Sequence, residues 1–382
     1  MSTSCSKPLP ALLMLIPVLI ATVLYSYKIT STDLWTPDEP RYALVAREMI
    51  ESGDFINPQI NGEPYAEKPP LFFWAVAAGA KLFGSVDSFT TRLPSIISAF
   101  GTIILLVVFL DRYLGRRTAV IAGCILATSP LFFWHARSGH IDLLLTFLLT
   151  ASLTSFYRWH KSRDSRHLAV FYGGIALAML AKGPVALLLP LLVVIMFLLL
   201  QKQAGELKRM LPHIALPIAL APLVVWYLLA KQDTSGLEAG SVVSRQVFMR
   251  LFGGGGHSVS VWYWPFYHLL SLAWGMAPWS LLLPFAVAWA WKMRENEPLT
   301  FMFCWSAAIF GFFTLIASKR ELYLLPMYPA AAALAGQWMR PVQRAEGSQA
   351  DPTDHACVGG GAPAGHDRGC CRGTLFSEKG IS

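Results

Sequence analysis

The chain has 382 residues, of which 54% are hydrophobic and only 14% are charged. Soluble domains carry roughly 25% charged residues, so this composition excludes an ordinary soluble protein and predicts an integral membrane protein. The formal net charge of +8 does not by itself indicate nucleic-acid binding, because the cations must first be placed along the chain.

Long apolar stretches recur along the sequence, and a membrane-spanning helix needs about 20 such residues. Ten stretches meet or approach this length: 9–27, 94–111, 118–136, 142–159, 167–182, 183–200, 212–230, 266–291, 299–318 and 321–339. No small-residue cleavage site follows the first, which favours an anchor over a cleaved signal peptide. The sequence therefore predicts an all-α, polytopic bundle of about ten spans over residues 1–339. Residues 340–382 are polar and rich in Gly and Cys, and we expect them to be disordered.

Basic residues fall in every second connection between these stretches. They are Lys7, Arg112, Arg116, Arg117, Arg158, Lys161, Arg163, Arg166, Lys202, Lys208, Arg209, Lys292, Arg294, Arg340 and Arg344. Cytoplasmic loops carry such an excess, so both termini are expected in the cytoplasm. The long connection 28–93 is then extracytoplasmic.

Two short helices are expected in the connection 28–93. The segment DEPRYALVAREMIES, residues 38–52, has one apolar stripe and begins with Asp38 and Glu39. The helix dipole favours ionised carboxylates at this end, although simple helix capping is left open for both acids. Residues 71–84, LFFWAVAAGAKLFG, are apolar but too short to span, and their aromatic start predicts an interfacial helix.

Further charges gather on the same outer side. Asp142 opens a span, where an acid is costly unless it is paired or functional, and capping is again the alternative. The positive-inside rule disfavours the cations that lie there: Arg41, Lys68, Lys182, Arg250, Lys319 and Arg320. Each alone could extend its charge along the membrane surface, but together they favour a bound anion, and a lipid-linked phosphate is the obvious one.

Five blocks occur in a characteristic order: DEPRYA, EKPPLFFW, the Asp of HIDLLLTF, AKGP and SKRELYLLPMYP. In this combination the chain resembles the C-fold glycosyltransferases that use polyprenyl-phosphate sugars. It is most similar to the bacterial aminoarabinose transferases of lipid A and to protein mannosyltransferase-like enzymes. The resemblance implies a multi-pass enzyme of the bacterial inner membrane with a periplasmic active site. Its partners would be the polyprenyl-phosphate donor and a lipid, protein or envelope-glycan acceptor, with no nucleic acid.

The resemblance also implies roles for individual residues. Asp38 matches the catalytic acid of the first loop, and Asp142 matches the second acidic position. The donor phosphate would be bound by Arg41, Lys68, Arg250, Lys319, Arg320 and Tyr323. Glu67, with Glu39, corresponds to acids beside a divalent metal ion in some members, but SRQVFMRLF offers no histidine ahead of the arginine, so a metal cofactor is left open.

Two other interpretations fit the same polytopic architecture. A flippase or transporter of polyprenyl-linked lipids would also be polytopic and bind a lipid phosphate, but it would carry charges or broken helices near the membrane midplane. An inactive, truncated pseudoenzyme is the other alternative, because lipid A transferases continue with further spans and a soluble domain where this chain has its polar tail.

Overall fold

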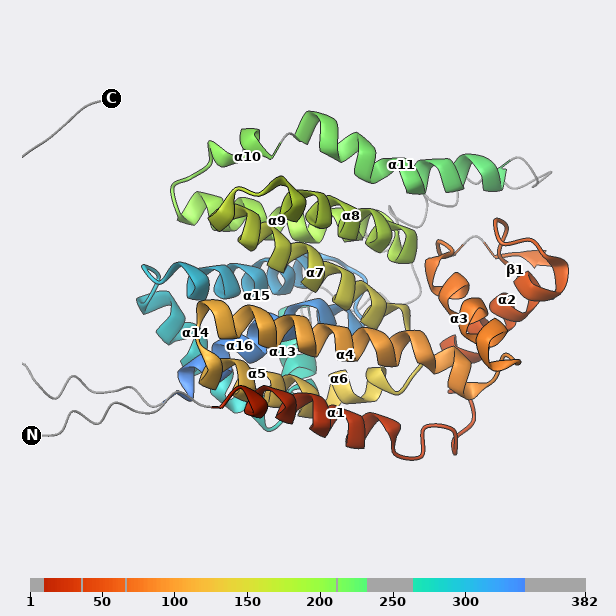
Figure 1. Ribbon diagram of the computed structural model, residues 1–382, viewed down its shortest axis with the longest axis horizontal. Helices are drawn as coiled ribbons and strands as arrows, with labels where there is room; N and C mark the ends of the chain where they lie inside the picture. Colours follow the sequence, from red (N-terminus) through yellow and green to blue (C-terminus); the bar gives the residue numbers. More distant parts are fainter. Residues whose placement is uncertain (1–9, 36, 66, 211, 232–263, 341–382) are drawn as a thin grey trace, which may run out of the picture. The chain divides into compact units, whose positions relative to one another are not determined.

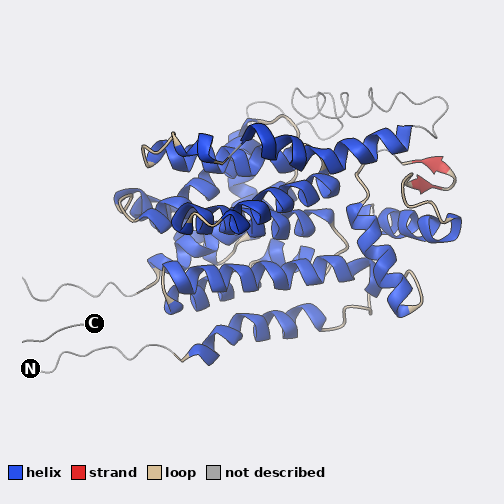
Figure 2. Cartoon of the chain, turned by 45° about the horizontal axis from the view of Figure 1, so that its top comes forward, coloured by secondary structure: helices blue, strands red, loops and turns tan. Residues whose placement is uncertain are grey.

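The computed structural model describes residues 10–35, 37–65, 67–210, 212–231 and 264–340. These residues are almost entirely helical, with one short hairpin (Figure 2), which confirms the all-α prediction. Arg250 and the expected disordered tail from residue 341 onward lie outside the described residues.

The elements follow one another in a simple order. They are η1 (Ala11–Leu15), α1 (Ile16–Ser26), α2 (Asp38–Ser52), β1 (Gln59–Ile60), β2 (Glu63–Pro64), α3 (Leu71–Phe83), α4 (Ser88–Tyr113), α5 (Arg116–Thr128), α6 (Pro130–Ala136), α7 (Ile141–Ser162), α8 (Ser165–Lys182), α9 (Val185–Leu200), α10 (Glu206–Arg209), α11 (Pro212–Lys231), α13 (Trp264–Gly275), η3 (Trp279–Leu282), α14 (Leu283–Lys292), α15 (Glu297–Leu315), η4 (Glu321–Met327) and α16 (Tyr328–Trp338).

The described helices that meet the length and composition of a membrane span are fewer than the ten apolar stretches of the sequence. Within the described ranges, four helices are long and apolar enough to cross a membrane: Ser88–Tyr113, Ile141–Ser162, His213–Ala230 and Glu297–Leu315. Two bent pairs raise the number to six, with bends of 67° between α5 and α6 and 120° between Phe266–Gly275 and Trp279–Lys292. The first bend has a local cause, because Ser129 is extended ahead of Pro130. A membrane protein is therefore supported, while the count of ten is not confirmed.

Helix α7 lies at the centre of the bundle and packs against α4, α8 and α9 (Figure 1). Small side chains allow other helices to approach closely. In α16, a Cβ on Gly336 would lie 2.9 Å from the backbone nitrogen of Ala122 in α5. Helix α16 thus packs directly against α5.

The first long connection forms a small unit with its own core, at one end of the bundle in Figure 1. Its hairpin turns at Asn61 and Gly62, which both have left-handed backbone angles, as a two-residue turn requires. The Glu48 carboxylate of α2 accepts hydrogen bonds from both turn amides, at 2.6 and 3.3 Å. Helix α2 is thereby tied to the hairpin.

The aromatic residues expected at a membrane interface have a different role. Phe72 and Phe73 are fully buried against Tyr42 of α2, with ring centroids 5.6 and 5.7 Å apart. The exposed apolar residues of α3 are Leu82 and Phe83 at its other end. The expectation is thus wrong for Phe72 and Phe73, because the loop needs them for its own core.

Candidate active site

Asp38 lies in the first turn of α2 and is bound by an arginine from the far end of the chain. Its Oδ2 accepts a hydrogen bond of 2.9 Å from Nη2 of Arg320, and Nδ1 of His140 lies 4.0 Å from the same oxygen. Only 8% of Asp38 is exposed. Its carboxylate therefore meets a guanidinium at the N-terminal end of the helix, where charge-assisted hydrogen bonds are strong.

Asp142 forms a second buried ion pair, with Lys182 at the end of α8. It lies in the first turn of α7, but the residue that caps this helix is His140, which makes no side-chain capping bond. Asp142 therefore does not cap α7 but forms an ion pair with Lys182. The Lys182 ammonium also lies 4.7 Å from the ring centroid of Tyr323, so an acid, a cation and a phenol meet here.

His140 lies close to the first ion pair, with Nδ1 4.0 Å from Asp38, and precedes Asp142 by two residues in the chain. Its ring is 6.5 Å from that of Tyr42. Burial lowers the pKa of His140, against the opposing pull of Asp142 and Asp38. The imidazole is therefore neutral near pH 7 and can accept or donate a hydrogen bond.

Arg41, Glu67 and Tyr65 form a group at the rim of the first loop. Nη1 of Arg41 lies 3.8 Å from Oε2 of Glu67, and the Tyr65 hydroxyl donates to the same oxygen at 3.4 Å. Lys68 is half-buried and follows Glu67 in the chain. This group is more exposed than the pairs around Asp38 and Asp142, with 38% and 53% of the Arg41 and Glu67 side chains accessible.

Lys319 has different surroundings from its neighbour Arg320. Its ammonium donates to the backbone carbonyls of Phe313 and Thr314, at 2.8 and 2.7 Å, and only 3% of the residue is exposed. These bonds satisfy carbonyls at the C-terminal end of α15. In this structure Lys319 therefore caps the C-terminal end of α15, whereas Arg320 donates a hydrogen bond to Asp38.

Glu39 is fully buried and bound on both oxygens. Nε and Nη2 of Arg92 donate to Oε1 and Oε2, each at 3.1 Å, and the amides of Gly139 and Trp35 add bonds of 2.5 and 2.6 Å. Glu39 thus ties α2 to α4, to the segment before α2 and to the turn before α7. The sequence reasoning missed Arg92, although an arginine two residues before a predicted span was a signal for a buried partner.

These contacts bear on the metal ion left open by the sequence. Both oxygens of Glu39 are occupied by an arginine and by backbone amides, and Glu67 faces Arg41. Over residues 10–340, apart from the ranges that are not described, no group of three or more His, Cys, Asp or Glu side chains could hold a metal. These residues therefore do not fit a resident metal, and no chemical step is assigned to one.

Known proteins share both the sequence pattern and the arrangement of helices. Residues 67–228 match the family model of dolichyl-phosphate-mannose-protein mannosyltransferase. The undecaprenyl phosphate-alpha-4-amino-4-deoxy-L-arabinose arabinosyl transferase of Pseudomonas aeruginosa LESB58 is 31% identical over 82% of this chain and 57% of its own length. An uncharacterized protein of Aquifex aeolicus is 31% identical over 86% of this chain and 63% of its own.

A similar solved structure is the crystal structure of ArnT from Cupriavidus metallidurans bound to undecaprenyl phosphate. It superposes with a TM-score of 0.75 at 26% identity, over 84% of this chain and 59% of that one. The resemblance to the C-fold glycosyltransferases is confirmed. The archaeal oligosaccharyltransferase AglB of Archaeoglobus fulgidus shares the C-type fold at a TM-score of 0.57 and 16% identity. The chain spans about three fifths of the length of the curated relatives from Pseudomonas aeruginosa and Aquifex aeolicus.

Proposed function

We propose that this chain transfers a sugar from a polyprenyl-phosphate donor to a lipid, protein or envelope-glycan acceptor. The observation that supports this most directly is the juxtaposition of two buried carboxylates, Asp38 and Asp142, with the cations Arg320 and Lys182 at one end of the bundle. The resemblance to ArnT, which was crystallised with undecaprenyl phosphate, points to the same class of donor.

In the proposed reaction the donor phosphate is the leaving group. Positive charge from Arg320, Arg41, Lys68 and Arg250 stabilises it as the glycosidic bond breaks, and one such preorganised contact contributes about 3 kcal/mol. Tyr323 would donate a hydrogen bond beside them. Lys319 belongs to the same loop, but its bonds to backbone carbonyls favour a supporting role.

Asp38 would take the proton from a hydroxyl acceptor, which is worth about 10²- to 10⁴-fold in rate. A phosphate acceptor is already ionised and needs no base, and Asp38 would then orient the sugar. Asp142, held by Lys182, would position the donor. No metal ion is required in this scheme.

We further propose that residues 1–339 form the catalytic membrane domain in the bacterial inner membrane. Ten spans, with both termini in the cytoplasm and the active site on the periplasmic face, agree with the alternation of basic connections. Each of the ten apolar stretches coincides with one or two of the helices described above.

Surface chemistry fits better than transport. In the part of the chain that the structure describes, ion pairs lie at helix ends or in connections, as for Asp142 at the start of α7 and Lys182 at the end of α8. A transporter would carry such charges near the membrane midplane.

The test uses membranes that contain the full chain, a labelled polyprenyl-phosphate sugar and candidate acceptors. Asp38→Asn and Lys68→Ala should each lower turnover by about 100-fold or more. Glu51→Gln is the matched control, because this acid is exposed on α2 and should leave turnover unchanged. Wild-type turnover in both site variants would refute the proposal, and so would donor binding without any product.

A further inference from the structure

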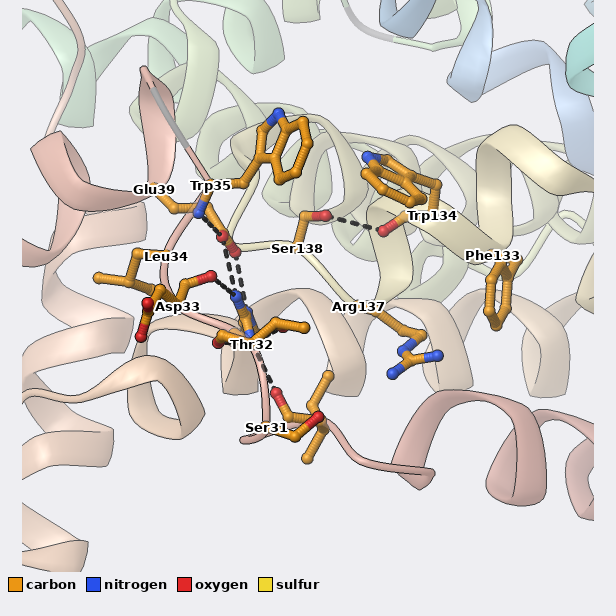
Figure 3. Close-up of a pocket in the computed structure, with 12 residues that line it drawn as sticks. Ser31, Thr32, Asp33, Leu34, Trp35, Glu39, Phe133, Trp134, Arg137 and Ser138 are labelled. Carbon is orange, nitrogen blue, oxygen red and sulfur yellow. Dashed lines mark hydrogen bonds and ion pairs between the residues drawn. The ribbon is translucent and has the colours of Figure 1, made fainter.

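A separate cavity of about 670 Å³ lies beside the segment 29–35, α6 and the turn that follows it. Glu39 and Arg92 contribute to its wall, whereas Asp38 does not line it. In Figure 3, Trp35 and Trp134 lie on one side of this cavity and Ser31 and Thr32 on the other. It is therefore distinct from the cluster around Asp38.

Two cations line the cavity, Arg92 and Arg137, and within the described ranges only the first of them has a carboxylate partner. The Arg92 guanidinium is neutralised by Glu39, but among the described residues no carboxylate lies within ion-pair distance of Arg137. Arg137 is held in place by a bond of 2.6 Å from Nη2 to the carbonyl of Tyr27, and by the Phe133 ring 5.3 Å away. Figure 3 shows the Asp33 carboxylate on the far side of the segment from Arg137.

The mouth of the cavity has the composition of a membrane interface. Trp35 and Trp134 pack edge to face, 5.7 Å apart, yet remain 63% and 50% exposed. Tryptophan is enriched where lipid headgroups meet the hydrocarbon layer. Large exposed rings beside a cation are costly in water and favourable at that depth.

An exposed apolar stripe leads along the neighbouring helix toward this mouth. Leu15 at the end of η1 and Leu19 and Val23 of α1 recur every fourth residue, which places them on one face. The next position, Tyr27, is the residue whose carbonyl binds Arg137. A hydrocarbon chain on this stripe would thus end where the cation begins.

We propose that this cavity binds the phosphate headgroup of an anionic phospholipid, with its acyl chains along α1. Arg137 contacts the phosphate oxygens, because a guanidinium with a single carbonyl partner retains donors for a charge-assisted pair. The Thr32 hydroxyl, whose oxygen accepts a bond of 3.2 Å from Nη1 of Arg92, can donate to the same group, and the two tryptophans enclose the glycerol region. This site is independent of the sugar-transfer reaction and involves no covalent step.

Lipid binding is measured by native mass spectrometry of the full chain in detergent, titrated with phosphatidylglycerol. Arg137→Ala should weaken binding at least about fivefold, and Arg137→Lys should retain part of it because the charge remains. Arg166→Ala, which removes an exposed arginine of α8, is the matched control and should bind as wild type. Equal binding by Arg137→Ala and the control would overturn the proposal.

A second measurement does not depend on the folding of the Arg137 variant. Phosphatidylglycerol brominated near its headgroup should quench less tryptophan fluorescence in the double variant Trp35→Phe/Trp134→Phe than in wild type. An unchanged quenchable fraction, after allowing for the two lost fluorophores, would refute the site. Displacement of the lipid by millimolar inorganic phosphate would instead indicate a site for free anions and would also overturn it.

Discussion

Breaking the buried pair between Asp142 and Lys182 should cost far more stability than removing it altogether. Lys182→Met leaves a carboxylate without its partner in the packed end of α7, and Asp142→Asn leaves an unpaired ammonium. The double variant Asp142→Asn/Lys182→Met removes both charges. We therefore expect each single variant to be less stable than the double one.

The magnitude follows from burial. The side chains of Asp142 and Lys182 are only 8% and 7% exposed, and breaking such a pair costs about 3–5 kcal/mol. At roughly 2 °C per kcal/mol for a long chain, Tm should fall by about 6–10 °C. The pair between Asp111 and Arg116 is the control, because its side chains are 27% and 32% exposed and such pairs contribute about 0–1 kcal/mol.

Thermal unfolding in one detergent, followed by tryptophan fluorescence, provides the comparison. Asp111→Asn should shift Tm by about 2 °C or less. If Asp142→Asn and Lys182→Met shift Tm no more than this control, the pair is not desolvated as the structure indicates. A double variant that loses the full sum of both single losses would equally refute the coupling.

Three further predictions concern two residues beside the site and one ion pair at the other end of α7. Glu39→Gln should lower Tm by about 4 °C or more, because it leaves Arg92 buried without a counter-charge, whereas an equal effect of the exposed control Glu51→Gln would contradict this. Gly139→Ala should reduce turnover about tenfold or more, since the new Cβ would lie 2.9 Å from the carbonyl oxygen of Thr91 and displace the turn beside His140. Gly173→Ala, where the added methyl meets open space, is its control, and similar losses in both would count against the close approach. Glu206→Gln should flatten the acid limb of a plot of Tm against pH. Burial would raise the Glu206 pKa, but hydrogen bonds from Arg163 and His160 hold it below its usual value. The ionised Glu206 therefore stabilises the fold above about pH 4.5, and this stabilisation is lost as the pH falls through the lower pKa of the folded state. An acid limb identical to that of the wild type would refute this assignment.

The helices were largely predictable from the sequence because apolar runs and their ends leave a clear pattern. The acids of α2 and its buried stripe follow the predicted arrangement, including Tyr42, Val45 and Met49. The hairpin was missed although Asn61-Gly62 is a strong turn signal. Its strands are only two residues long, too short for an alternating pattern.

The site was only partly predictable, for a physical reason. The sequence places charges at one end of the bundle, but the pairing between them depends on packing. Arg320 meets Asp38 across 282 positions of the chain, while the adjacent Lys319 turns to helix carbonyls. Similarly, the position of Arg92 just before a predicted span indicates a buried cation but not which acid it binds, because the contact with Glu39 forms only when α2 docks on α4.

The neighbouring acids Asp38 and Glu39 bind different partners. Side chains of successive helical residues diverge by about 100° around the axis, so one faces Arg320 and the other enters the contact with Arg92 and Gly139. Insertion of one residue just ahead of them would leave the two sets of contacts unchanged. Exchanging their order would put the shorter aspartate side chain where Arg92 and the amides of Gly139 and Trp35 donate four hydrogen bonds to Glu39. The order of these two residues in the sequence thus separates the carboxylate that pairs with Arg320 from the one that ties the helix to its neighbours.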